Sequence, residues 1–294
     1  MMNRSDLTKY AEENHLPFAQ VFGWYVMGLF LVLLRKNHFL EQMWLVTPSA
    51  LDPSKDCHVL EEGLRFYYTE DERITKSDGF VPGCEMKSDF RERLLMKLQM
   101  DAREMKLPLE IKSIGAKERV EVHYDGMYVP LKFQIQKAQR GIFPIEDELE
   151  FFGCKERKIS ILRYPSEEAA ADHVDVIMEK LELLNEMEEY LSLYELVSTT
   201  PMSGRDVSEA VGRRLCQSGR SAKRKTYELW ASYSNSPFLR KKWKVLLRRH
   251  HMKSPTWEEV HSQLSLFIKP VWETLEKEDI FFGDWMPQLG RYLD

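Results

Sequence analysis

The sequence predicts an α+β protein in which a mixed-sheet part is followed by a helical part. Between residues 43 and 164, short runs of alternating or β-branched residues recur, as in half-buried strands. After Ser166, nearly the whole chain to Lys277 is rich in strong helix formers. A chain of 294 residues, 43% of them hydrophobic, can bury substantial cores. We therefore predict one domain over residues 1–165 and a second over 166–294.

The individual elements follow from periodicity and from turn residues. Helices are predicted over Leu7–His15, from Val21 to about His38, and over Ser88–Lys106. Strands are predicted at Met43–Thr47, Leu64–Tyr68, Leu109–Ile114, Arg119–Tyr124, Leu131–Gln136 and Lys158–Tyr164. In the second part, the segment that begins Thr256-Trp257-Glu258-Glu259 fits a capping box, which marks the start of a helix.

The segment Val21–Leu34 contains fourteen residues without a charge. A membrane-spanning helix needs about 20 apolar residues. A signal peptide needs a basic segment directly before its apolar run, whereas the residues before Val21 are mixed and acidic. A helix that is apolar on all sides is typical of a domain centre. We therefore predict a buried core helix in a cytoplasmic protein without membrane contact.

Common catalytic and metal-binding motifs are absent from the sequence. There is no phosphate-binding loop, dinucleotide fingerprint, nucleophile elbow or His-Glu-x-x-His zinc motif. The four cysteines, Cys57, Cys84, Cys154 and Cys216, form no Cys-x-x-Cys pair. This spacing favours buried, reduced thiols and no metal site.

Positive charge is concentrated in residues 205–253, which hold fourteen Lys or Arg and three acids in a chain of net charge −5. Such asymmetry predicts an anionic partner. If the basic runs Gly212–Lys225 and Arg240–Lys253 form neighbouring helices, they present one cationic face, with Tyr227, Trp230 and Trp243 available for stacking on bases. The predicted nucleic-acid contacts are Arg224, Lys225, Lys241, Lys242, Lys244, Arg248 and Arg249. The alternative is that Trp243, Val245, Leu246 and Leu247 pack inward while the charges are solvated, and the two interpretations are compatible.

Several segments, taken in order, resemble one protein family. They are the early apolar helix, Arg-Tyr-Pro-Ser-Glu-Glu at Arg163–Glu168, the segment Glu179–Leu196, and the Trp-containing helices that end in Phe-Ile-Lys-Pro. This series resembles the AbiEii-like toxins, bacterial nucleotidyltransferases of the abortive-infection toxin–antitoxin type. The resemblance implies a polymerase-β-like nucleotidyltransferase core. In that core, Gly-Gly-(Ser/Thr) holds nucleotide phosphates, Asp-x-Asp and a later acid hold Mg²⁺, and a helical Lys and Asp complete the site.

The sequence departs from this pattern where phosphate and metal would bind. Thr47-Pro48-Ser49 stands in place of the glycines, and proline has no amide to donate. In place of Asp-x-Asp there are Glu61 and Glu62, which are adjacent and so point to opposite faces of an extended chain. The later strand carries Gln134 and Gln136, whose amides ligate Mg²⁺ weakly.

The helical part of the pattern is kept only partly. The resemblance places Lys180 near the start of a helix that continues to Leu196, with Ser192 in place of the first acid and Glu195 in place of the second. If the site works, the resemblance assigns catalysis to Lys180, Glu195, Glu61 and Glu62, nucleotide binding to Ser49, and Mg²⁺ with an NTP as cofactors. The number of losses instead indicates a degenerate site. The alternative is that these residues are solvated surface groups.

Three functional hypotheses are compatible with these observations. The first is a degenerate nucleotidyltransferase of a toxin–antitoxin or phage-defence system that acts on or binds RNA, such as tRNA, or a protein such as an antitoxin. The second is a non-catalytic, nucleic-acid-binding subunit of a larger defence assembly. The third is a helical regulatory protein whose resemblance to the family is accidental.

Overall fold

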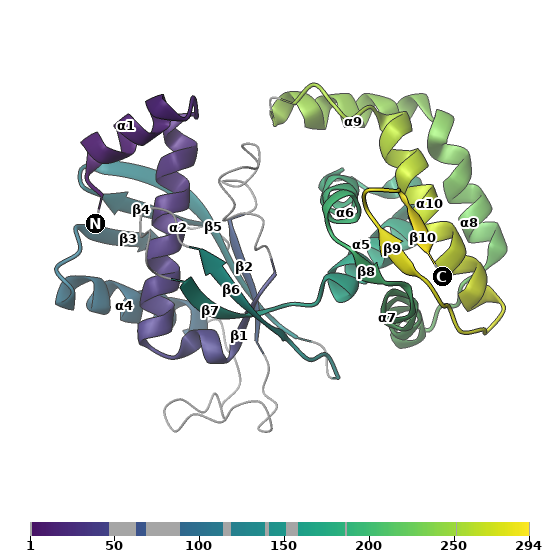
Figure 1. The fold of residues 1–294 in the computed structure, drawn as a ribbon, viewed down its shortest axis with the longest axis horizontal. Helices are drawn as coiled ribbons and strands as arrows, with labels where there is room; N and C mark the ends of the chain where they lie inside the picture. Colours follow the sequence, from purple (N-terminus) through teal and green to yellow (C-terminus); the bar gives the residue numbers. More distant parts are fainter. Residues whose placement is uncertain are drawn as a thin grey trace. The chain divides into compact units, whose positions relative to one another are not determined.

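The computed structural model describes residues 2–46, 63–68, 89–113, 119–138, 141–150, 158–185, 187–250 and 252–293. The chain divides into two compact units, Met1–Tyr164 and Pro165–Asp294 (Figure 1). The first contains a seven-stranded mixed sheet with helices, and the second is mainly helical. The predicted α+β class, with a mixed-sheet part followed by a helical part, is confirmed.

The sheet of the first unit has the strand order β3-β4-β5-β2-β1-β7-β6. The strands are β1 Met43–Leu45, β2 Leu64–Tyr68, β3 Leu109–Ser113, β4 Arg119–Tyr124, β5 Met127–Lys137, β6 Ile145–Glu150 and β7 Lys158–Arg163. At its centre β2 runs parallel to β5 and antiparallel to β1, and β1 runs parallel to β7. This pairing places residues from distant parts of the sequence side by side in the middle of the sheet.

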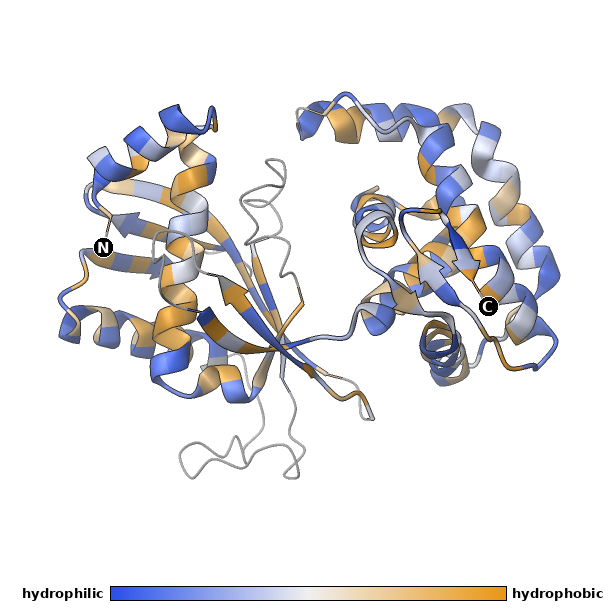
Figure 2. Ribbon diagram, viewed as in Figure 1, coloured by the Kyte–Doolittle hydropathy of each residue, from blue (hydrophilic) through white to orange (hydrophobic). Residues whose placement is uncertain are grey.

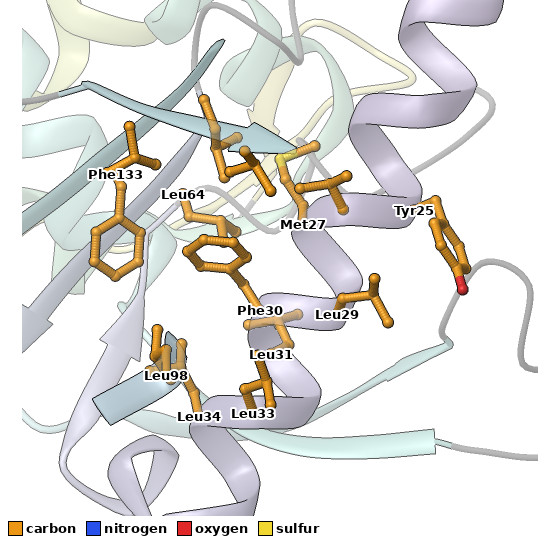
Figure 3. Close-up of a cluster of buried hydrophobic side chains, with 14 of the residues drawn as sticks. Tyr25, Met27, Leu29, Phe30, Leu31, Leu33, Leu34, Leu64, Leu98 and Phe133 are labelled. Carbon is orange, nitrogen blue, oxygen red and sulfur yellow. The ribbon is translucent and has the colours of Figure 1, made fainter. Parts of the chain in front are cut away.

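The described helices of the first unit contribute to one hydrophobic core with the inward faces of the strands. They are α1 Arg4–Glu13, α2 Phe18–Lys36, the 3₁₀ helix η1 Phe39–Glu41 and α4 Asp89–Glu104. Helix α2 is drawn mainly in the hydrophobic colours of Figure 2. In Figure 3 its side chains lie against those of the sheet, and the Phe30 ring centroid is 5.7 Å from that of Phe133.

Helix α2 is long and apolar enough to cross a membrane by length and composition, but 78% of its most apolar window is buried inside the unit. Trp24 and Phe30 are fully or almost fully buried. The predicted core helix is therefore confirmed, although it begins at Phe18 and not at Val21. A cytoplasmic location stays a prediction.

Two features of the sheet differ from the prediction. Strand β5 begins at Met127 and not at Leu131, because Asp125 and Gly126 both take positive φ and turn β4 back into it. Asp-Gly is the preferred pair for such a turn. Strand β6 was not predicted. Its sequence IEDELE is rich in acids that disfavour strands, and its pairing with β7 overrides that preference.

The second unit consists of helices around its own core. They are α5 Ser166–Lys180, η3 Leu181–Leu183, α6 Glu188–Thr199, α7 Gly204–Gln217, α8 Arg224–Ala231, η4 Ser232–Asn235, α9 Pro237–Arg249 and α10 Trp257–Glu276. The predicted capping box at the start of α10 is confirmed, since Thr256 N donates to Glu259 Oε2 at 2.7 Å and Glu259 N donates to Thr256 Oγ1 at 3.3 Å.

Two smaller features of this unit were not foreseen. Strands β8 Met202–Ser203, β9 Asp284–Met286 and β10 Arg291–Leu293 form a small antiparallel sheet, and strands of two or three residues are too short to show a period. Cys216 is free, but it is exposed on α7, so the expectation of a buried thiol is wrong there because its side chain points away from the helix's buried face. The other three cysteines lie outside the described residues.

Candidate functional site

The centre of the sheet is where the family resemblance would place the metal site. On β2, Leu64, Phe66 and Tyr68 face the core, so Arg65 and Tyr67 point to the opposite face. Strand β5 alternates in the same way, and its register sets Gln134 beside Arg65 and Gln136 beside Tyr67. Arginine and glutamine therefore line the polar face of the two central parallel strands.

Direct contacts tie this polar face together. Arg65 Nε donates a hydrogen bond to Gln134 Oε1 at 3.2 Å. The Tyr67 ring lies against that of Tyr164, with 4.5 Å between the centroids. The side-chain oxygen of Gln134 thus already accepts a hydrogen bond from the Arg65 guanidinium.

These groups do not fit Mg²⁺. A divalent cation needs several hard oxygen ligands, mostly carboxylates. Neither β2 nor β5 carries an acid over its described length, and the Arg65 guanidinium repels a cation at this position. Ser49, Glu61 and Glu62 lie outside the described residues. Among the described residues of the chain, no group of three or more His, Cys, Asp or Glu is placed to hold a metal ion.

Lys180 and Glu195 do not share the helix that the resemblance implies. Helix α5 ends at Lys180, Leu181 takes a positive φ of 49°, and α6 begins only at Glu188. Lys180 is therefore an exposed residue in the last helical turn, where a cation is favoured by the helix dipole. Glu195 is half-buried on α6.

The segment between α5 and α6 is contacted by a residue of α9. Lys242 Nζ of α9 donates to the Leu184 carbonyl oxygen at 2.7 Å, and Leu184 is buried. A helix that continued through this segment would use that carbonyl in its own ladder. Tertiary contacts thus override the high local helix propensity of Glu179–Leu196.

Three arginines on α7 or just after it form ion pairs within the second unit. Arg214 is only 4% exposed, and its guanidinium donates to Asp172 Oδ1 at 2.6 Å and to Glu168 Oε2 at 2.8 Å. Arg213 also pairs with Glu168. Arg220 Nη2 lies 2.6 Å from Asp175 Oδ1. All three acids come from α5, so this cluster joins α5 to α7.

Burial and ion pairing have opposite effects on the pKa of a carboxyl group in this cluster. Burial raises the pKa of Asp175, against the opposing effect of the neighbouring Arg220 and Arg214 guanidiniums. Arg224, at the start of α8, pairs with Glu228 at 2.8 Å, and its hydrogen bond to that carboxylate raises its pKa. Of the residues predicted from the first basic run, only Lys225 remains exposed with no ion pair within the described chain.

The two basic runs do not form the neighbouring helices that one shared cationic face would require. Residues 212–225 form the end of α7 and the first turn of α8, whereas the second run lies on α9, beyond the other end of α8. Figure 1 shows α7 and α9 well apart within this unit. Arg213 and Arg214 of α7 pair instead with acids of α5, which a charge count along the sequence does not reveal.

Two of the three predicted stacking aromatics are in the core, and Tyr227 is partly buried against it. Trp230 and Trp243 are buried, with their indole N–H groups bonded to Tyr190 Oη at 3.1 Å and to the Pro255 carbonyl at 2.7 Å. Trp243, Leu246 and Leu247 pack inward as the alternative interpretation states. Val245 does not, because half of its side chain is exposed.

Helix α9 carries the remaining cationic surface, and it is mostly hydrophilic in Figure 2. Lys241, Lys244 and Arg248 are exposed and make no ion pair with another described residue. Arg249 pairs with Glu188, and Arg240 pairs with Glu258. The free charge of α9 is therefore concentrated on Lys241, Lys244 and Arg248.

A hollow of about 300 Å³ lies along α9. It is lined by Asn185, Met187, Glu188, Phe238, Lys241, Lys242, Val245, Leu246 and Arg249. Phe238 is 55% exposed, and the Lys242 ammonium sits 4.5 Å from its ring centroid. Sequence reasoning did not single out Phe238, although it stands three residues before Lys241 and so on the same side of the helix.

Comparison with known proteins finds remote likeness among solved structures. No family model matches the sequence, and no curated protein matches it. Among solved structures, the chain is similar to MenT4, a nucleotidyltransferase toxin from Mycobacterium tuberculosis H37Rv. The two share 10% sequence identity with a TM-score of 0.43, over 94% of this chain and 99% of that chain.

Proposed function

We propose that the chain is a nucleotidyltransferase-fold protein of the AbiEii toxin type that has lost its metal site and acts by binding RNA. The ordered sequence resemblance supports the fold, and so does the arrangement of the core helix α2 before the central strands β1, β2 and β5. The observation that carries the proposal is the Arg65–Gln134 hydrogen bond on the face where Mg²⁺ ligands belong.

The loss of transfer follows from the charge of this face. Nucleotidyl transfer relies on Mg²⁺ to neutralise the phosphoryl group as negative charge develops on it. A site built from a guanidinium, an amide and a phenol offers no carboxylate to hold the metal. Arg65 at the centre of the sheet instead favours an anion on this face. In this proposal the fold is retained as a scaffold and not as a catalyst.

Binding to RNA is proposed for the second unit. Three unpaired cations on one side of α9 give a surface that attracts phosphates. A role in toxin–antitoxin or phage defence in the cytoplasm is part of the proposal through the family resemblance. The alternative is that the chain is a non-catalytic, nucleic-acid-binding subunit of a larger defence assembly, for which the same cations of α9 would form the binding surface.

Incubation of the protein with labelled NTPs, Mg²⁺ and total tRNA should transfer no label to an acceptor, because the central strands lack metal ligands. Gel autoradiography with each of the four NTPs measures this directly. Label transfer that is abolished by Lys180→Ala would contradict the proposed loss of activity. It would place catalysis on residues outside β2 and β5.

Reversing the charges of α9 should remove RNA binding. The triple variant Lys241→Glu, Lys244→Glu, Arg248→Glu should weaken tRNA affinity on the order of 100-fold at moderate salt and flatten its salt dependence, because three phosphate contacts become repulsive. A mobility-shift titration at several salt concentrations measures both effects.

The matched control for charge is Lys106→Glu, Lys277→Glu, Arg291→Glu, which changes the net charge equally at three exposed positions with no ion pair among the described residues. It should leave tRNA affinity within a few-fold of the parent. Equal losses in the two triple variants would mean that net charge, and not α9, drives binding, and the proposal would fail.

A further inference from the structure

We infer that the hollow beside α9 takes single-stranded nucleic acid, with an unpaired base stacked on Phe238 and backbone phosphates at Lys241, Lys244 and Arg248. This rests on the proposed nucleic-acid binding and specifies the form of its ligand. The inference joins three observations: an exposed aromatic ring, a hollow of limited size, and a line of unpaired cations on the same side of one helix.

The Phe238 ring is prepared for stacking. It lies in the first turn of α9, which is fixed by its Ser236 cap, with Leu239 N donating to Ser236 Oγ at 3.4 Å. Lys242 holds its ammonium over one face of the ring, and its bond to the Leu184 carbonyl keeps it there. More than half of the side chain is exposed, which leaves the second face open to a base.

The hollow suits one base at a time. Its volume of about 300 Å³ is at the lower end of the range for small-ligand sites. Asn185, at its edge, is exposed and carries both a donor and an acceptor for the edge of a base. A duplex keeps its bases stacked inside and cannot place one on Phe238.

The cations continue the line that begins at Phe238. Phe238, Lys241 and Val245 lie on the side of α9 that lines the hollow. Lys244 and Arg248 lie next to Lys241 on the helix surface, just outside the hollow, because they are three and seven residues from it. Lys241, Lys244 and Arg248 are spaced about 4.5 and 6 Å along the axis at a rise of 1.5 Å per residue. This repeat suits a chain that carries one charge per nucleotide, with its bases turned toward the ring.

Size argues against a protein as the occupant. A stable protein interface buries about 800 Å² on each partner. The exposed apolar groups beside these cations are the two partly exposed side chains Phe238 and Val245 among the described lining residues. Such a small apolar patch framed by cations has the composition of a single-stranded nucleic-acid site, where aromatic stacking and phosphate contacts share the binding energy.

The test is fluorescence anisotropy of the full chain with labelled oligouridylate and oligoadenylate, and with an RNA duplex of the same length. Both single strands should bind more tightly than the duplex. Phe238→Ala should weaken single-strand binding roughly 10-fold without changing its salt dependence, since stacking involves no counterion release. Phe238→Trp should keep the affinity. Leu266→Ala, which truncates a comparably exposed side chain on α10, is the matched control and should have no effect.

The outcomes separate this inference from the proposed function. If duplex and single strand bind equally and Phe238→Ala changes neither affinity, RNA binding stands but the stacking site is wrong. If neither nucleic acid binds, both are wrong. If an acidic polypeptide such as polyglutamate binds more tightly than the RNA strands and depends on Phe238, the occupant is a protein and the inference is overturned.

Discussion

Replacing Arg214 by methionine should lower the free energy of unfolding of the second unit by about 3–5 kcal/mol, which is the usual effect of removing one partner from a buried ion pair. The substitution keeps an unbranched apolar stem and removes the guanidinium. It leaves the Glu168 carboxylate, in a residue only 8% exposed, with Arg213 as its remaining ion-pair partner. Asp172 loses its bond to Arg214 Nε. A carboxylate buried with too few partners destabilises the fold far more than the original pair stabilises it.

Urea unfolding of the full chain, followed by tryptophan fluorescence, measures this effect. Five of the seven tryptophans belong to the second unit, so the signal reports mainly on it. Arg205→Met is the control, because Arg205 forms an exposed pair with Glu209 within α7, and removing it should leave stability almost unchanged. Adding Glu168→Gln to Arg214→Met should recover part of the loss, since it removes the charge that was left unpaired. Equal effects of Arg214→Met and Arg205→Met would refute the structural role of this cluster.

The same cluster shows why charge along a sequence does not translate directly into a charged surface. Arg213 and Arg214 stand about 45 residues from Glu168 in the chain, and only the packing of α5 on α7 brings them together. The basic segment can be recognised in the sequence, but the sequence does not show which of its cations form ion pairs with acids of the same unit. What remains for an external partner is the α9 group, which is smaller than the predicted face.

Elements with a strong local signal were predicted well. Strands β2 and β4 have the predicted ends, since each alternates with period two between clear turn residues. The break after Lys180 could not be predicted, because most residues around it favour a helix and the Leu184 carbonyl is bonded by Lys242 from the distant helix α9. The small sheet of β8, β9 and β10 could not be predicted for a related reason. Its strands are defined by pairing between distant residues and not by a pattern in their own sequences.

The candidate site on the sheet could be predicted in part. The alternation of β5 already placed Gln134 and Gln136 on one face, where the resemblance requires an acid. Arg65 lies beside Gln134 because β2 pairs in parallel with β5. The two strands are about 70 residues apart, so no local sequence pattern encodes this pairing. No local pattern shows that Phe238 is exposed while Trp230 and Trp243 are buried, since that depends on how the helices pack.

Replacing Gly63 by alanine should lower the free energy of unfolding of the first unit by roughly 2–5 kcal/mol. Gly63 has φ of +60°, where a side chain costs about 1–2 kcal/mol. A Cβ there would lie 2.1 Å from the Lys132 carbonyl oxygen and 2.7 Å from its Cβ. Lys132 belongs to β5, so its backbone cannot retreat without opening the β2–β5 ladder, and overpacking of this kind adds about 1–3 kcal/mol.

Gly126→Ala is the matched control because Gly126 has φ of +73° but nothing within 4 Å of an added Cβ. It should show the conformational effect alone, about 1–2 kcal/mol. Hydrogen exchange of the Phe66 and Ile135 amides, which belong to the paired strands, measures both variants in the intact chain. Equal protection in the two would mean that the Lys132 contact is relieved at no energetic expense. The β2–β5 pairing that leaves room only for glycine at position 63 also sets Arg65 beside Gln134. If the Gly63→Ala protein folds, the local displacement of these strands should therefore break the Arg65–Gln134 hydrogen bond while the hydrophobic core remains packed.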